Sequence, residues 1–136
     1  MLDDDCWKTA EDATDFWQFL PDFGKRATFN TKVKLVYDDN AIYMAALMLD
    51  PEPSKINRKL TARDQKAYGI ADVFVVGFDT YLDGVNAFRF ELTAANVQTD
   101  GRLISPDTYD LNWDAVWQSK VGPMLTFVKQ LIHCKR

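Results

Sequence analysis

The chain has 136 residues and a net charge of −4, which predicts a single domain over residues 1–136 that is large enough to bury a core of its own. Apolar residues make up 47% and charged residues 26% of the sequence, proportions that exclude a disordered chain. The acidic balance argues against nucleic-acid binding, because that partner requires a basic face. The longest uncharged apolar run, residues 41–49, is too short to span a bilayer as a helix, so we expect no membrane insertion.

The first elements of the chain predict a hairpin. The aromatic run at 16–20 does not form one helical stripe and fits an extended segment better. Residues 31–37 alternate in polarity, which predicts a half-buried strand, and a turn at 38–40 leads into the apolar run 41–49. Because that second strand is apolar on both faces, we expect the run at 16–20 to cover one of them. The expected inward side chains of the first strand are Val33, Leu35 and Tyr37.

The rest of the chain continues as short strands between turns. Ser54 follows a proline break and predicts one short helix near 54–60. Strand patterns with turn signals between them are typical of an antiparallel β-sandwich, so we expect an all-β fold of jelly-roll or immunoglobulin-like type. The expected strands are 71–78, 86–92, 97–100 and 115–121, with a loop at 101–112.

Several classes of chemistry have little support in the sequence. His133 is the single histidine and lies near the end of the chain, which argues against a Ser-His-Asp or Cys-His enzyme. Cys6 and Cys134 cannot hold zinc by themselves and could either form a disulfide or stay free thiols. Seventeen of the twenty acidic residues are Asp, so a carboxylate pair such as Asp79 and Asp83 is weak evidence for a glycosidase. We expect no enzyme.

Seven groups of residues occur together in one order: 2–7; 36–43; 60–64; 72–74 with 78–83; 86–90; 97–100; and 113–117. This ordered set resembles the carbohydrate-binding module family 9-like domain, a relative of the DOMON group. The resemblance covers about residues 2–121, and residues 122–136 depart from the family pattern as an atypical tail. It implies a β-sandwich that binds sugar, with calcium in some members and haem in some DOMON relatives.

The resemblance implies a non-catalytic carbohydrate-binding module whose partner is an oligosaccharide or polysaccharide. It also implies the N-terminal part of a larger bacterial envelope or secreted protein, so we expect this chain to be a fragment of a periplasmic or extracellular parent. The alternative is a structural docking domain that packs on a neighbouring domain, or on a second copy through an exposed edge, and binds no sugar. A calcium- or haem-binding relative is the weaker alternative.

Four side chains with sugar-binding chemistry come from two parts of the sequence. Trp113 and Trp117 could stack on sugar rings, although a tryptophan in a sandwich is more often part of the core. Arg63 could bind sugar hydroxyls, or it could pair with Asp72 and brace a loop, the role that we favour.

A second group of candidates flanks the turn after the strand at 71–78. Asp79, Tyr81 and Asn86 are placed to contact a ligand, and the Asn86 amide could bind vicinal hydroxyls or cap its own turn. We expect no cofactor and assign no metal ligands. Calcium stays open, because Asp79 with Asp83, or Asp107 with Asp110, could each offer two carboxylates. For haem, the available axial ligands would be His133, Met44 or Met48.

Overall fold

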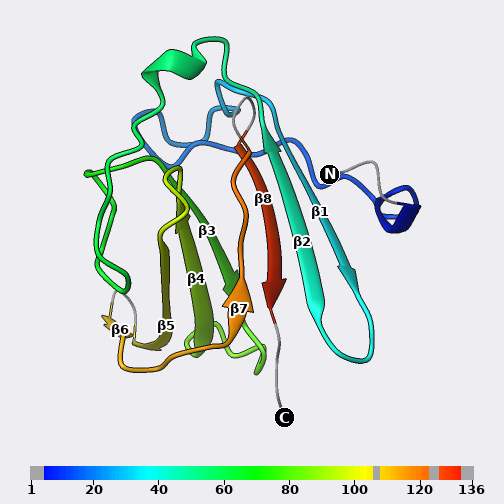
Figure 1. Ribbon diagram of the computed structural model, residues 1–136, viewed down its shortest axis with the longest axis vertical. Coiled ribbons are helices and arrows are strands. Elements are labelled where there is room, and N and C mark those ends of the chain that lie inside the picture. The colour runs from blue at the N-terminus through cyan, green and yellow to red at the C-terminus, as the bar shows by residue number, and fades with distance from the viewer. Residues whose placement is uncertain (1–4, 106–107, 123–125, 133–136) are drawn as a thin grey trace. The chain divides into compact units, whose positions relative to one another are not determined.

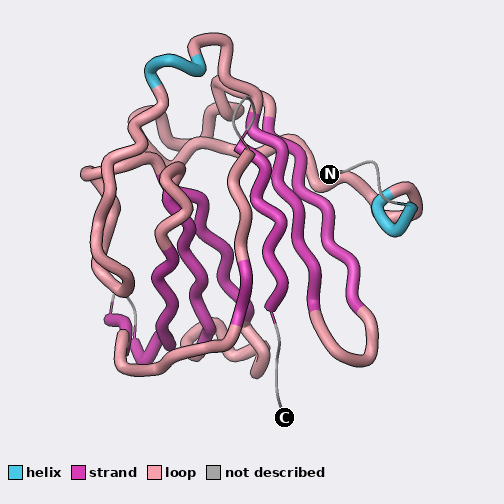
Figure 2. The backbone as a smooth tube through the Cα atoms, in the orientation of Figure 1, coloured by secondary structure: helices cyan, strands magenta, loops and turns pink. Residues whose placement is uncertain are grey.

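The computed structural model describes residues 5–105, 108–122 and 126–132, the last of these through its backbone path (Figure 1). The chain divides into two compact units, Met1–Ser54 with Lys120–Arg136, and Lys55–Ser119. Strands form the frame of both units, and the helical segments are single 3-10 turns (Figure 2). The predicted roles of Asp107, His133 and Cys134 lie outside the described residues, and the single domain over 1–136 stays a prediction.

The first unit is built on the predicted hairpin, which is confirmed. β1 (Thr31–Tyr37) and β2 (Ile42–Met48) pair in an antiparallel register. The Asp38 carboxylate closes the turn, because its Oδ1 accepts hydrogen bonds from the backbone N–H groups of Asn40 at 2.8 Å and Ala41 at 2.9 Å. The turn triplet therefore fixes the register through the side chain of its first residue.

The other edge of β2 is paired with a strand that the sequence did not reveal. β8 (Thr126–Ile132) runs antiparallel to β2 over the full length of that strand. The stretch at 122–136, which we expected to be an atypical tail, thus supplies a strand of this sheet. Ala45 and Ala46 at the centre of β2 point to opposite faces of the sheet, and both are buried, which agrees with the apolar character of both faces of the run at 41–49.

Two expectations for the first unit are wrong. Leu35 and Tyr37 are 43% and 79% exposed, so the apolar side chains of β1 do not all face inward. The aromatic run at 16–20 does not bury its side chains, and the segment before it pairs with β1 through an Ala13–Val33 bridge. Alternation predicts a strand, but which side of an edge strand is covered depends on its tertiary neighbours.

The second unit contains a four-stranded antiparallel meander in the order β3-β4-β5-β6. Residues 101–112, which we expected to be a loop, are wrongly assigned, because β5 runs on to Ser105 and β6 pairs back against it. The strands are β3 (Val73–Phe78), β4 (Ala87–Thr93), β5 (Gln98–Ser105) and β6 (Thr108–Asp110), followed by the short β7 (Trp117–Gln118).

In place of the predicted helix near 54–60, the structure has a 3-10 turn, η2 (Pro53–Lys55). A second turn of the same length, η1 (Asp5–Trp7), lies near the N-terminus. The residues after η2 are held extended by side-chain bonds. The Asn57 N–H donates to Asp72 Oδ2 at 2.9 Å, and the Asn57 amide donates to the Ile70 carbonyl at 2.8 Å. The bond to Asp72 uses the backbone N–H of Asn57, which a continued helix would need for its own hydrogen bonds. Among the described residues, no helix is both long and apolar enough to cross a membrane.

Candidate functional site

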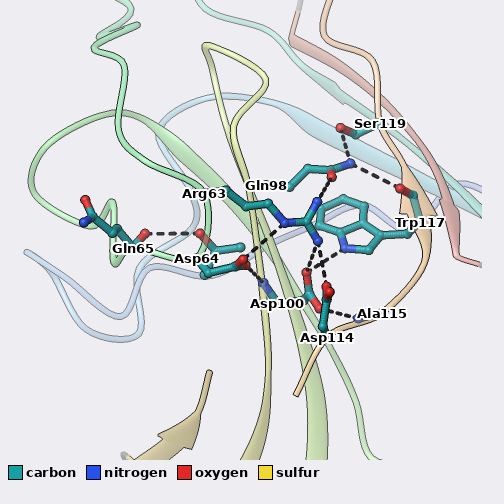
Figure 3. Close-up of polar contacts among 10 residues, drawn as sticks. Arg63, Asp64, Gln65, Gln98, Asp100, Asp114, Ala115, Trp117 and Ser119 are labelled. Atoms are coloured by element: carbon teal, nitrogen blue, oxygen red, sulfur yellow. Dashed lines mark hydrogen bonds and ion pairs between the residues drawn. The ribbon is translucent and has the colours of Figure 1, made fainter. Parts of the chain in front are cut away.

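Arg63 is the centre of a polar network in the second unit (Figure 3). Its Nε–H donates to Asp64 Oδ2 at 3.1 Å, and one terminal nitrogen donates to Gln98 Oε1 at 3.0 Å. The other terminal nitrogen contacts Asp114 at 2.8 Å and Asp100 at 3.4 Å. Four acceptors thus share one guanidinium, two of them on β5, and the planar fork of arginine suits such bracing.

The brace predicted for Arg63 is therefore present, but its predicted partner is wrong. Asp72 accepts a hydrogen bond from the backbone of Asn57 instead and ties the segment after η2 to the start of β3. Both side chains are engaged in protein contacts, and their predicted contact with a sugar stays a prediction. Sequence could not choose the partner, because Arg63 and Asp114 are separated by 51 residues.

Trp117 belongs to the same network and is not a stacking surface. Its side chain is 6% exposed, and its indole N–H donates to Asp100 Oδ1 at 2.9 Å. The Phe90 ring meets the indole edge to face, with 5.5 Å between ring centroids. The Asp100 carboxylate is 1% exposed and also accepts the Ala115 N–H at 2.7 Å.

Burial raises the pKa of Asp100, and the charges of Asp114 and Asp64 act in the same direction, while the hydrogen bonds from Trp117 and Ala115 oppose the shift. The network therefore holds a buried carboxylate whose ionised form depends on its donors. Its chemistry is structural, because every oxygen of Asp100 already has a protein partner.

Trp113 is half-buried and packs against two rings of β4. Its ring centroid lies 4.7 Å from that of Phe88 and 6.0 Å from that of Phe90. The indole thus supports the Phe88 ring from one side. This contact gives Trp113 a positioning role beside the pocket described next, because Phe88 lines that pocket.

The loop between β3 and β4 is held in shape by hydrogen bonds to two of its own aspartates. Asp79 accepts backbone hydrogen bonds from Tyr81 at 3.2 Å, Asp83 at 3.3 Å and Gly84 at 2.8 Å. Asp83 in turn accepts the backbone N–H of Asn86 at 2.7 Å and its side-chain amide at 2.7 Å. Gly84 adopts a φ of 71°, a conformation that favours glycine at this turn.

These bonds act on the charge of the loop as well as on its shape. The amide and the backbone N–H of Asn86, followed by the N–H of Val85, lower the pKa of Asp83 because they stabilise its ionised form. The carboxylate is therefore fixed and charged at neutral pH. Asp79 and Asp83 together hold the backbone of this loop through their carboxylates.

A pocket of about 230 Å³ opens beside this loop. Tyr81, Asp83 and Asn86 from the loop form one wall, and Ala87 and Phe88 of β4 with Arg102 of β5 complete the lining. Tyr81 is 70% exposed, so its ring faces solvent at the mouth. The pocket combines an aromatic ring, an amide, a carboxylate and a guanidinium, the groups that recognise sugar hydroxyls and the apolar face of a sugar ring.

Arg102 is the residue of this pocket that sequence reasoning missed. It lies directly across from Phe88 in the β4–β5 ladder, and within the described part of the chain its guanidinium has no hydrogen-bond or ion-pair partner. The sequence did not indicate Arg102 as a site residue, because residues 101–112 were predicted to be a loop. Had the strand been extended past Gly101, the alternation would have placed Arg102 and Phe88 on one face.

The structure thus brings together Tyr81, which bonds to Asp79, and Asn86, which bonds to Asp83. The residues Arg63, Asp72 and Trp117 do not line this pocket. Within residues 5–105, 108–122 and 126–132, no three His, Cys, Asp or Glu side chains gather as a metal site would require. A calcium ligand set therefore stays a hypothesis.

Comparison with known proteins shows the fold. No family model matches the chain, and no curated protein matches it. Two solved structures do match, both a carbohydrate binding module family 9 (CBM9) from Caldicellulosiruptor kristjanssonii, one in complex with cellotriose and one with glucose. Each has a TM-score of 0.63 and 21% identity and covers 98% of this chain. The chain covers 60% of the first structure and 62% of the second, so it spans less than two thirds of their length.

The expected all-β antiparallel β-sandwich class is confirmed by this likeness, and the chain is a CBM9-like domain in its fold. At 21% identity the likeness carries no residue roles. The site must therefore be argued from the pocket itself.

Proposed function

We propose that this CBM9-like chain is a non-catalytic carbohydrate-binding module, with an oligosaccharide or polysaccharide as its partner. The structurally similar CBM9 modules were solved in complex with cellotriose and with glucose, which makes glucose-based sugars the first ligands to test. The observation that carries the proposal is the pocket lined by Tyr81, Asn86 and Arg102. It unites stacking and hydrogen-bonding groups on a loop that is already rigid.

Each group in the pocket has a distinct task in this proposal. The exposed Tyr81 ring covers the apolar CH face of a sugar, which removes apolar surface from water. The Asn86 amide carbonyl accepts a sugar hydroxyl, since the amide nitrogen is held by Asp83 at 2.7 Å. The Arg102 guanidinium donates to sugar oxygens without first breaking a protein ion pair. Because the loop is held by hydrogen bonds before ligand arrives, binding costs little ordering.

Isothermal titration calorimetry with glucose and cellotriose tests the proposal. We expect Tyr81→Ala and Arg102→Gln each to weaken binding by about tenfold or more, equivalent to roughly 1.4 kcal/mol. Tyr68→Ala is the matched control, because Tyr68 is also an exposed tyrosine of the second unit but lies outside the pocket lining. Equal binding by all three variants would remove the pocket from the proposal, and a folded protein that binds no sugar would remove the function.

The same titration with calcium and with a chelator tests the calcium hypothesis. Calcium-dependent affinity would bring the acidic loops into the site, whereas unchanged affinity in the chelator would remove calcium from it. A haem-binding role stays the weaker alternative, with His133, Met44 or Met48 as its candidate axial ligands. A haem titration followed by visible absorbance checks it.

We further propose that the module acts in a periplasmic or extracellular parent protein, because polysaccharide partners are met there. Fractionation of the source cells, with an antibody against the module, tests this location. Recovery in the cytoplasmic fraction alone would contradict it.

A docking domain is the second candidate function, and an exposed apolar hairpin favours it. Residues 16–27 fold back on themselves through a Trp17–Arg26 bridge and a Gln18–Lys25 backbone hydrogen bond of 2.7 Å. The hairpin leaves five large apolar side chains exposed, which is typical of an interaction surface. They are Phe16, Trp17, Phe19, Leu20 and Phe23.

A further inference from the structure

The first unit has a groove of its own, separate in sequence from the pocket beside Tyr81. It has a volume of about 670 Å³ and lies between the N-terminal segment and the end of the β1–β2 hairpin. One wall comes from residues 7–11 and the other from residues 35–38, with Tyr43 of β2 beside them. The volume is about three times that of the pocket beside Tyr81, so the groove has room for more than one sugar ring.

The wall formed by the N-terminal segment is fixed by one lysine of β1. The Lys34 ammonium donates to the Trp7 carbonyl at 3.0 Å and to the Ala10 carbonyl at 2.8 Å, and it pairs with Asp12 at 3.1 Å. Lys34 and Lys32 lower the pKa of Asp12, so the pair stays charged at neutral pH. The Ala13–Val33 bridge then ties the next residues to β1. The groove is therefore built before any ligand is bound.

The lining combines exposed apolar surface with acceptor groups. Tyr37 is 79% exposed and Leu35 is also exposed, although both stand on a strand whose pattern predicted burial. Tyr43 donates its hydroxyl to Asp38 Oδ2 at 3.0 Å, which fixes both polar groups at this end of the groove. Glu11 contributes an exposed carboxylate on the opposite wall. An aromatic ring beside several acceptors is the combination that a sugar needs, with its CH face and its hydroxyl donors.

The charge of the lining limits the ligand. Glu11 and Asp38 line the groove, and no Lys or Arg is among the described lining residues. The nearby cations are already engaged, since Lys32 and Lys34 pair with Asp12, and Lys8 pairs with Asp5 at 2.6 Å. The exposed Glu11 carboxylate disfavours uronic-acid or sulfated glycans at this wall through like-charge repulsion.

We propose that this groove is a second glycan-binding site, which takes an uncharged oligosaccharide of two or more sugar rings with Tyr37 as its stacking residue. The inference rests on the proposed carbohydrate-binding function and extends it, because the chain then carries two separate sugar contacts. Two contacts on one chain raise the apparent affinity for a long polysaccharide well above that for a short oligosaccharide, provided that one strand or two neighbouring strands reach both.

Nuclear magnetic resonance with ¹⁵N-labelled full chain and cellotriose distinguishes the two sites. We expect saturable amide shifts at residues 35–38 and, separately, at residues 81–86. Tyr37→Ala abolishes the first set and leaves the second, whereas Tyr81→Ala does the reverse. Tyr68→Ala is the control for removal of an exposed tyrosine elsewhere and keeps both sets. A uronic-acid trisaccharide, used in place of cellotriose, leaves the amides at 35–38 unshifted.

Each result decides a separate question. Shifts at 81–86 without shifts at 35–38 overturn the second site and preserve the proposed function. Shifts at 35–38 that survive Tyr37→Ala, or that the uronic acid produces equally, overturn the assigned chemistry of the groove. No shifts anywhere in a folded chain refute carbohydrate binding itself. The exposed position of Tyr37 makes loss of folding an improbable cause, and the dispersion of the variant spectrum checks it.

Discussion

The hydrogen bond from Trp117 to Asp100 gives a direct test of the network around Arg63. Trp117→Phe keeps an aromatic ring against Phe90 but removes the indole N–H that donates to Asp100 Oδ1 at 2.9 Å. The carboxylate is 1% exposed, so water does not readily replace the lost donor. We therefore expect a loss of stability rather than a loss of sugar binding.

The magnitude follows from what the carboxylate retains. A hydrogen bond to a charged group contributes about 1.5–3 kcal/mol, and the smaller phenyl ring adds a packing loss. The Ala115 N–H at 2.7 Å and the Arg63 guanidinium at 3.4 Å remain, so Asp100 is not left without partners. We expect the free energy of unfolding to fall by about 2–3 kcal/mol, which lowers the melting temperature by roughly 6–10 °C for a chain of this size.

Urea denaturation followed by circular dichroism measures the change, with Trp113→Phe as the matched control. Trp113 packs on Phe88 at 4.7 Å and makes no hydrogen bond within the described residues, so its substitution costs less. If the two variants lose equal stability, the Trp117–Asp100 bond contributes nothing and the reasoning is refuted. Unchanged cellotriose affinity of folded Trp117→Phe is expected as well, since Trp117 is outside the pocket lining.

The pH dependence gives a second check on the same bond. Burial raises the folded-state pKa of Asp100 above 3.8, so its contribution to stability is complete below pH 3.8 and is lost as pH rises through the folded pKa. Loss of the Trp117 N–H donor destabilises the ionised form of Asp100 more than its protonated form. The destabilisation by Trp117→Phe is therefore larger at pH 7 than near pH 3.8, and a pH-independent loss would point to packing alone.

Three further predictions concern backbone, surface and loop. Gly101→Ala lowers the free energy of unfolding by about 1–3 kcal/mol, because an added Cβ would lie 3.0 Å from the Leu111 side chain and 3.1 Å from the Asp110 carbonyl. Gly77→Ala, which has open space, raises it by roughly 0.4–1 kcal/mol. Urea denaturation midpoints compare the two variants. Phe19→Ser with Phe23→Ser leaves the melting temperature unchanged and abolishes any self-association seen by light scattering, and persistent association would place the contact elsewhere. Asp83→Asn lowers stability at pH 7, and its difference from the parent chain narrows as pH falls below 3.8, because the folded pKa of Asp83 is lowered; a constant difference contradicts this.

Local features of the fold could be predicted from the sequence where one short segment contains the whole cause. The β1–β2 hairpin followed from alternation and from a turn that begins with Asp38, whose carboxylate caps that same turn. The β3–β4 loop followed in the same way, because Asp79 and Asp83 bond to backbone groups at most five residues away. Tyr81 and Asn86 were therefore found as candidate site residues.

Strands that depend on a partner elsewhere in the chain were harder to predict. β8 is joined to β2 across more than seventy residues, and the extension of β5 past Gly101 depends on β6. A strand of this kind has no strong signal of its own, because its register comes from the neighbour with which it pairs. Because the predicted strand at 97–100 stopped before Gly101, the prediction also missed Arg102.

The sequence by itself determined the all-β class, the acidic turns and two of the residues of the candidate site, Tyr81 and Asn86. Only the tertiary structure decided what the tryptophans and Arg63 do. Trp113 and Trp117 are four residues apart and look equivalent in sequence, yet one packs on Phe88 and the other donates to a buried carboxylate. The difference arises because Asp100, 17 residues from Trp117, lies beneath one indole and not the other, and burial of that kind is set by the packing of distant segments.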